Sequence, residues 1–155
     1  MKLNQIVIIG VVLLLSFAGG QFTSSGMDWY RTIQLPEWTP PGSVIGIVWT
    51  TIYILTAISA IIAWRVFTGD SRFYLVAGLF MMNAAFNLAW SYIFFARRMI
   101  GPAVIDSIAI EITLLALIPV LWKKSRAAAV LLLPYALWVG FATYLNYCIY
   151  ALNKT

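Results

Sequence analysis

Five long runs of apolar residues, separated by short polar segments, dominate the pattern of this chain. A helix needs ~20 apolar residues, at ~1.5 Å each, to cross the hydrocarbon core of a bilayer. Each run is long enough, so the pattern predicts an all-α integral membrane protein made of one five-transmembrane-helix bundle. The predicted helices cover residues 3–22, 43–67, 73–96, 102–122 and 127–152.

Composition supports the membrane assignment and narrows the chemistry. Hydrophobic residues make up 63% of the 155 residues and charged residues 10%, whereas about a quarter of a soluble domain is charged. The basic residues lie at the predicted helix ends, which is typical of membrane topology and indicates no nucleic-acid partner. Histidine is absent and Cys148 is the single cysteine, so the sequence predicts no metal site and no disulfide framework.

The first run has some features of a signal peptide, with Lys2 before the apolar core and Ala18-Gly19-Gly20 after it. It is longer than a usual signal-peptide core, and four helices would enclose a ligand poorly, so we expect the helix to be retained. Six Lys or Arg residues fall on the N-terminal side of the membrane and four on the other. This count favours a cytoplasmic N-terminus and an outward loop over residues 23–42.

The predicted loop 23–42 ends in a stiff turn. Pro40 and Pro41 fix the backbone and remove two N–H donors, so Trp38 must lie in an extended segment just before the second helix. A long loop of this kind often forms a lid over a cavity. Trp29 and Tyr30 also fit the alternative of an aromatic belt at the membrane interface.

Polar and aromatic side chains recur inside the second and third helices. Trp49 and Tyr53 are four residues apart and therefore share a helix face, as do Asn83 and Asn87. Amides in hydrocarbon are costly unless paired, so the two asparagines should point inward. They either form hydrogen bonds between helices or line a ligand cavity together with the aromatic residues beside them, Phe86 and Trp90.

Two acidic residues lie in the predicted fourth helix. Asp106 is near the helix N-terminus, where it either favours the helix dipole and pairs with Arg97 or Arg98 or has a functional role. Glu111 is deeper in the span, where it serves a proton pathway or acts as a hydrogen-bonding packing residue.

Four stretches of the sequence resemble one known family. They are Pro36-Glu37-Trp38-Thr39-Pro40-Pro41-Gly42, Gly46-Ile47-Val48-Trp49, Asn87-Leu88-Ala89-Trp90 with Phe94-Phe95, and Pro134-Tyr135 through Trp138 to Phe141-Ala142-Thr143-Tyr144-Leu145-Asn146-Tyr147. Together they resemble the TspO/MBR family, that is, the tryptophan-rich sensory proteins and the translocator proteins, whose mitochondrial members are called peripheral-type benzodiazepine receptors. The resemblance covers the whole chain and implies a five-helix bundle, commonly a homodimer, in a bacterial cell membrane.

The resemblance also implies ligands and site residues. Family ligands are porphyrins such as protoporphyrin IX and haem, sterols in mitochondrial members, and benzodiazepine-site drugs. Tyr147 is one residue too far from Lys154 for the usual sterol motif, so the chain departs from the family pattern at this point. Trp49 and Trp138 match pocket tryptophans linked to light-dependent porphyrin breakdown. The positions that match the pocket or its lid are Tyr30, Pro40, Pro41, Asn87, Trp90 and Ala142.

The resulting expectation is a membrane tetrapyrrole-binding protein that senses, transports or photochemically degrades porphyrin without a required cofactor. Stacking on Trp49 and Trp138 suits the flat face of a porphyrin, and polar groups suit its edges. The alternative is a proton-coupled secondary transporter that uses Glu111 or Asp106. The full predicted ligand site is Tyr30, Trp38, Pro40, Pro41, Trp49, Tyr53, Asn83, Phe86, Asn87, Trp90, Trp138 and Ala142.

Overall fold

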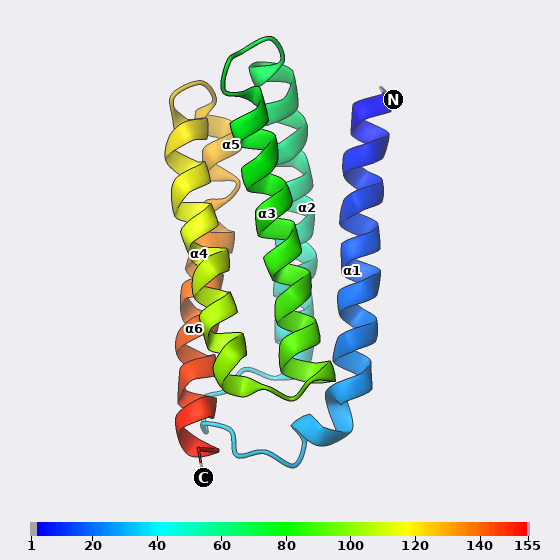
Figure 1. The fold of residues 1–155 in the computed structure, drawn as a ribbon, viewed down its shortest axis with the longest axis vertical. Helices are drawn as coiled ribbons and strands as arrows, with labels where there is room; N and C mark the ends of the chain where they lie inside the picture. The colour runs from blue at the N-terminus through cyan, green and yellow to red at the C-terminus, as the bar shows by residue number, and fades with distance from the viewer. Residues whose placement is uncertain (1–2, 155) are drawn as a thin grey trace.

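A computed structural model describes residues 3–154 and shows a bundle of long helices (Figure 1). Five stretches in this part of the chain are long and apolar enough to cross a membrane, which agrees with the predicted fold class. The elements are α1 (Leu3–Tyr30), α2 (Gly42–Phe67), α3 (Phe73–Ser91), the π-helix η1 (Tyr92–Ala96), α4 (Ile100–Trp122), α5 (Arg126–Val130) and α6 (Leu133–Leu152).

The helices form a ring around a narrow interior. α1 packs against α2 and α3, α3 packs against α4, α4 packs against α6, and α5 and α6 close the ring onto α2. Figure 1 shows α1 at one edge of the bundle and α4 and α6 at the other. The α2–α3 and α4–α5 turns lie at the same end as the N-terminus, and the loops after α1 and η1 lie at the opposite end with the C-terminus.

The first helix is longer than predicted, so the prediction of a loop over residues 23–42 is wrong for residues 23–30, which are helical. Thr23 and Ser25 bond their hydroxyls to backbone carbonyls one turn earlier, at 2.9 and 2.7 Å, and so remain compatible with a helix. Gly26 lets the helix approach η1 closely, because a Cβ there would lie 2.5 Å from the Phe95 carbonyl oxygen. The connecting loop is therefore residues 31–41.

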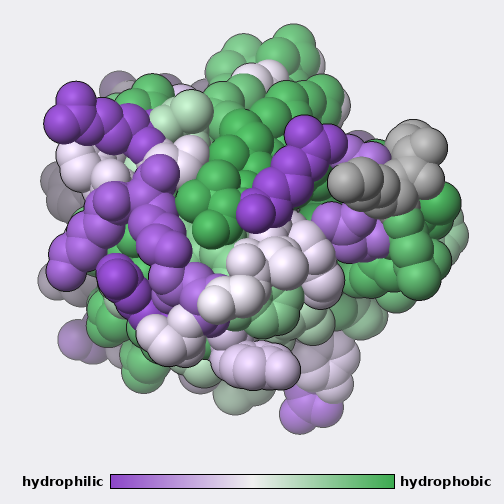
Figure 2. Space-filling view, turned by 90° about the horizontal axis from the view of Figure 1, so that it is seen from above, coloured by the Kyte–Doolittle hydropathy of each residue, from purple (hydrophilic) through white to green (hydrophobic). Residues whose placement is uncertain are grey.

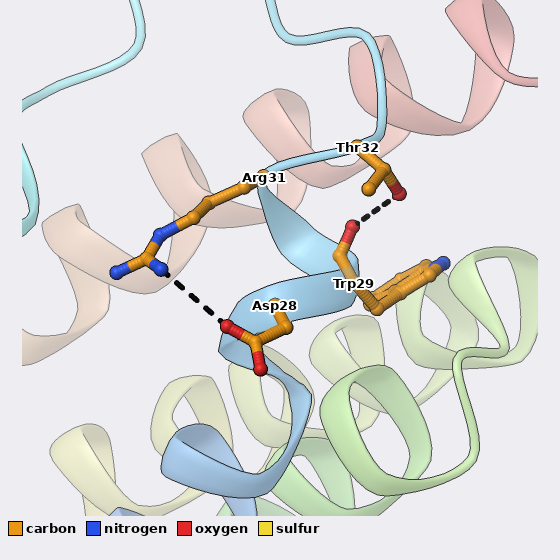
Figure 3. Close-up of polar contacts among 4 residues, drawn as sticks. All are labelled: Asp28, Trp29, Arg31 and Thr32. Atoms are coloured by element: carbon orange, nitrogen blue, oxygen red, sulfur yellow. Dashed lines mark hydrogen bonds and ion pairs between the residues drawn. The ribbon is translucent and has the colours of Figure 1, made fainter.

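Local contacts end α1 and start this loop (Figure 3). Arg31 pairs with Asp28 at 3.4 Å, and the Thr32 hydroxyl donates to the Trp29 carbonyl oxygen at 2.7 Å. Both charged side chains of the pair are largely exposed. Such a pair contributes little to stability, so the packing of α1 on η1 is the larger influence on where the helix ends.

The last predicted helix, 127–152, is interrupted. α5 ends at Val130, and α6 starts at Leu133 with Pro134 in its first turn. Proline has no N–H and clashes with the carbonyl of the preceding turn, so it fits the start of a helix but not its interior. The fourth helix begins at Ile100, two residues before the predicted start at Pro102.

The third predicted span is continuous but contains a wide turn. In η1 the Arg97 N–H donates to the Tyr92 carbonyl oxygen, five residues earlier, at 2.9 Å. Phe94 and Phe95 are buried in this turn, where they meet the end of α1. Aromatic contacts join the two elements, with Trp29 packed edge-on against Phe94 at 5.6 Å between ring centroids.

One acidic residue links the turns at the N-terminal end of the bundle. Asp70 pairs with Lys124 from the α4–α5 turn and with Arg72 Nε at 3.7 Å, and it accepts a hydrogen bond from the Arg72 N–H at 2.7 Å. The Lys124 side chain, together with Arg72, holds the pKa of Asp70 below its usual value. Figure 2 shows hydrophilic side chains gathered over the apolar bundle at this end.

Candidate functional site

Trp49 of α2 and Trp138 of α6, the two indoles predicted to hold a ligand, pack against one buried cluster. The cluster consists of Ile52, Ile110, Leu114, Tyr135 and Val139. Trp49 meets the ring of Tyr135 edge-on at 6.0 Å and that of Tyr53 at 5.7 Å. Both indoles therefore contact the interior of the bundle, and their role in holding a ligand stays a prediction.

The indole N–H of Trp138 is buried and has no hydrogen-bond partner among the described residues. A buried donor without a partner is costly, so such a group calls for an explanation. The Trp138 ring lies 5.3 Å from Phe141, and Phe141 lies 5.9 Å from Trp38 of the 31–41 loop. A row of aromatic rings thus connects the loop to the free indole N–H.

The 31–41 loop is fastened to α6 at two points. Trp38 stacks on Tyr144 at 5.8 Å with an interplanar angle of 12°. Asn153 accepts from the Gln34 N–H at 2.9 Å and donates to the Gln34 carbonyl oxygen at 2.8 Å. These contacts hold the loop against α6 from Tyr144 to the C-terminal end of the helix, and its role as a lid stays a prediction.

A hydrogen-bonded polar network crosses the middle of the bundle. Tyr53 donates to the Asn87 amide oxygen at 3.0 Å, and the Asn87 amide nitrogen donates to the Tyr135 hydroxyl at 2.9 Å. Asn83 donates to the Thr113 hydroxyl at 2.8 Å and to the Ile110 carbonyl oxygen at 3.3 Å. Asn83 and Asn87 therefore point inward, as predicted, and tie α3 to α2, α4 and α6.

A cavity of about 150 Å³ lies on the α1 side of this network. It is lined by α1, α2 and α3 and by Tyr135 of α6, and the predicted residues Tyr53, Asn83 and Asn87 are part of this lining. Asn83 and Asn87 therefore form hydrogen bonds between helices and also border this cavity, and their role in binding a ligand stays a prediction. Neither Trp49 nor Trp138 lines this cavity, so this cavity lies beside the two indoles and not between them.

The remaining predicted site residues fall into separate groups. Phe86 and Trp90 pack against the same cluster as the two indoles, and Trp90 also stacks on Phe94 at 5.1 Å. Tyr30 packs on Phe94 and Phe95 at 6.1 and 5.7 Å, away from the cavity. Pro40 is half-buried and Pro41 is exposed in the loop, and Ala142 is half-buried one turn after Trp138.

The two acids of α4 do not form a common path. Asp106 and Glu111 are five residues apart, or roughly 140° around the helix. Each has one buried carboxyl oxygen without a hydrogen-bond partner in the described structure. Among residues 3–154, Asp106 forms no ion pair with Arg97 or Arg98, contrary to the structural alternative for its role. No group of three metal-ligating side chains occurs within the same range.

Two interior residues were missing from the predicted site. Tyr135 is buried and joins the polar network to Trp49. Asn146, with its amide oxygen turned toward the donors, accepts from Trp90 Nε1 and the Val104 N–H, both at 3.2 Å. Tyr135 lies three residues before Trp138, so the shared helix face was a usable signal. The partners of Asn146 depend on helix packing that spacing does not reveal.

Five membrane-spanning helices with an aromatic interior and a polar network at mid-depth define a multi-pass integral membrane protein. The family model of the TspO/MBR family matches residues 8–152, so this chain belongs to that family. Membership supports a membrane sensory or porphyrin-related role.

Named relatives cover nearly the same length. The chain is 33% identical to the tryptophan-rich protein TspO of Bacillus cereus over 99% of both chains. It is 37% identical to the protein of that name from Archaeoglobus fulgidus over 97% of both chains. It is also 35% identical to the human translocator protein, over 88% of this chain and 82% of the human one.

Proposed function

We propose that this chain is a membrane receptor for a porphyrin, which binds against Trp49 and Trp138 beneath the 31–41 loop. The observation that carries the proposal is the pair of inward-facing indoles on one cluster, one of which has a buried N–H without a partner among the described residues. A porphyrin offers a flat apolar face for the rings and carboxylates at its edge for such a donor. The family membership of the chain supports the same ligand class.

Binding requires the protein to open. The two indoles do not line the cavity of about 150 Å³, and that volume is itself below the ~300–1,000 Å³ of typical ligand pockets. In the span of α1 the only buried residues are Gly19 and Gly26, and the 31–41 loop is held by aromatic stacking and a few hydrogen bonds. Displacement of the loop and part of α1 would widen the interior next to Trp138 without breaking the packing of α4 against α6.

If the protein acts on its ligand, the porphyrin itself is the chromophore. Light excites the bound porphyrin, which then reacts with oxygen or takes an electron from an adjacent indole. The protein supplies orientation and control of product release. Sterols, benzodiazepine-site drugs and a second copy of the chain remain proposed partners on the basis of the family alone.

The test is quenching of tryptophan fluorescence by protoporphyrin IX, in darkness and under illumination, with the absorption spectrum of the products recorded. The double variant Trp49→Phe/Trp138→Phe should weaken binding and slow any photoproduct formation. The matched control is Trp122→Phe, because Trp122 is exposed on α4 away from the cluster. Equal affinity and equal product yield in the double variant and the control would refute the site. Quenching without photoproducts would indicate a sensor rather than a degrading protein.

Proton-coupled transport is a second candidate, favoured by the buried, unpaired carboxyl oxygens of Glu111 and Asp106. It predicts porphyrin uptake into liposomes that depends on a pH gradient and is lost in Glu111→Gln. Uptake that is independent of the gradient would exclude it.

A further inference from the structure

A second, smaller cavity continues the first one toward the membrane surface. It has a volume of about 100 Å³ and shares Ile8, Ala60, Trp64, Phe80 and Met81 with the cavity above the polar network. Its far end is formed by Trp64 and Phe73, whose rings meet edge-on at 4.9 Å. The two cavities together form one apolar groove between α1, α2 and α3, which we call the α1 groove.

The length of the α1 groove matches one leaflet of a bilayer. From Tyr53 at its inner end to Trp64 at its mouth, α2 advances eleven residues, or roughly 16 Å at ~1.5 Å per residue. The hydrocarbon core of a bilayer is ~30 Å thick, so the groove runs from the interface to about the mid-plane. This is the span of a single acyl chain.

The chemistry of the walls fits such a chain. The lining between the inner end and the mouth is almost entirely aliphatic or aromatic. At the inner end, the hydroxyls of Tyr53 and Tyr135 already share the amide of Asn87, so this end closes the groove without needing a polar ligand group. An apolar cavity of ~150 Å³ stays dry and accepts apolar molecules.

The outer wall of the groove is loosely held. α1 contributes Val7, Ile8, Val11, Val12 and Leu15 to it, all from the N-terminal half of the helix. The buried residues of α1, Gly19 and Gly26, both lie in the other half, where the helix is packed against α3 and η1. The N-terminal half can therefore move aside to admit a chain from the surrounding lipid while the helix stays anchored.

The mouth of the groove lies at the more basic end of the bundle. Five Lys or Arg residues occur in or beside the α2–α3 and α4–α5 turns, namely Arg65, Arg72, Lys123, Lys124 and Arg126, against a single acid, Asp70. Asp70 engages Arg72 and Lys124. Arg65 follows Trp64 directly and has no ion-pair partner among the described residues. Basic groups at helix ends attract anionic lipid headgroups.

We propose that the α1 groove binds one anionic phospholipid of the surrounding bilayer, with an acyl chain between Trp64 and Tyr53 and the phosphate beside Arg65. This site is separate from the proposed porphyrin site, because neither indole lines the groove, and Tyr53 and Tyr135 at its inner end lie against Trp49. Lipid in the groove would hold the N-terminal half of α1 in place.

The experiment reconstitutes the full chain in nanodiscs of equal dioleoyl phosphatidylglycerol and dioleoyl phosphatidylcholine, extracts it in mild detergent and counts retained lipids by native mass spectrometry. We expect one phosphatidylglycerol, retained about fivefold over phosphatidylcholine, the factor for one basic residue near an anionic surface. Arg65→Gln should remove the preference. Lys154→Gln, at the opposite end of the bundle, is the charge-matched control and should keep it.

Occupancy of the groove is tested by filling it. Ala60→Phe places a ring in both cavities and should abolish retention of either lipid, whereas Ala116→Phe on the exposed face of α4 should not. Cross-linking with a phosphatidylglycerol that carries a diazirine near the end of one chain gives a readout in the wild-type chain. It should label residues of the inner cavity such as Leu15 and Ala84.

Three outcomes would overturn the proposal. Equal retention of the two lipids would exclude headgroup recognition at Arg65, and labels spread evenly over all helices would exclude a chain in the groove. Release of the bound lipid by protoporphyrin IX would show that the two ligands compete for one site, and so would contradict a separate lipid site. Failure of the double tryptophan variant to alter porphyrin binding would leave the lipid result unaffected, so the two proposals fail independently.

Discussion

The close approach of α1 to η1 at Gly26 allows a quantitative test. In Gly26→Ala the new Cβ would lie 2.5 Å from the Phe95 carbonyl oxygen, 2.7 Å from the Phe95 Cβ and 2.8 Å from the Phe95 carbonyl carbon. Carbon and carbonyl oxygen atoms normally approach to about 3.3–3.6 Å, so the helices must separate by several tenths of an ångström. Two of the three atoms belong to the backbone, so a side-chain rotation cannot relieve the clash.

The expected cost follows from two opposing effects. Overpacking of this kind costs about 1–3 kcal/mol, while alanine in place of glycine within a helix gains about 0.5–1 kcal/mol. We expect a net loss of about 1–2 kcal/mol. Because Trp29 and Tyr30 follow Gly26 within one turn and pack on Phe94 and Phe95, the loss should include loosening of the end of α1.

The assay is unfolding of the purified protein in mixed micelles by titration with sodium dodecyl sulfate, followed by far-UV circular dichroism and tryptophan fluorescence. Gly20→Ala is the matched control, since a Cβ at Gly20 meets nothing within 4 Å. It should be as stable as the wild type or slightly more so. If Gly26→Ala were as stable as Gly20→Ala, the close approach of α1 to η1 at Gly26 would be refuted.

Two further predictions concern the ends of the bundle. Because Lys124 lowers the pKa of Asp70 from its ordinary 3.8, the stabilisation by this carboxylate is present above that pH and is lost as the pH falls through the lower folded value. The difference in melting temperature between wild type and Asp70→Asn should therefore shrink from pH 7 to pH 3. The control Asp28→Asn, at an exposed position, should differ little from wild type at any pH. A difference between wild type and Asp70→Asn that stays constant with pH would contradict the ion pair. Asn153→Ala removes both hydrogen bonds to the 31–41 loop and should speed tryptic cleavage after the arginine of that loop several-fold, with unchanged cleavage at the opposite end of the bundle as the control.

The sequence predicted what depends on the length and polarity of each run. Five apolar runs were enough to place the spans, and the spacing of Asn83 and Asn87 was enough to turn them inward. The predicted end of the first helix was wrong, because Thr23 and Ser25, considered without their tertiary contacts, suggest a loop. The contact with Phe95 that accompanies the longer helix comes from an element about seventy residues later.

The candidate site was predicted less completely than the fold. Trp49, Phe86, Trp90 and Trp138 pack against one cluster, while their role in a ligand site stays a prediction. Tyr30 instead packs against η1, because the longer α1 carries it there. The position of the cavity depends on the distance of α1 from α2 and α3. The spacing of residues within a single helix gives no information on the distance between helices.

The wide turn at Tyr92–Ala96 has a consequence for comparing relatives. A bond that spans five residues instead of four accommodates one extra residue, so positions on either side are offset by roughly 100° from the continuation of a regular helix. An alignment with a relative that lacks this turn should therefore open a single-residue gap near Ile93. Deleting one residue there would restore the ordinary helical pitch. It would also rotate Phe94 and Phe95 away from α1, so that α3 would be a regular helix but α1 would lose its packing against this segment.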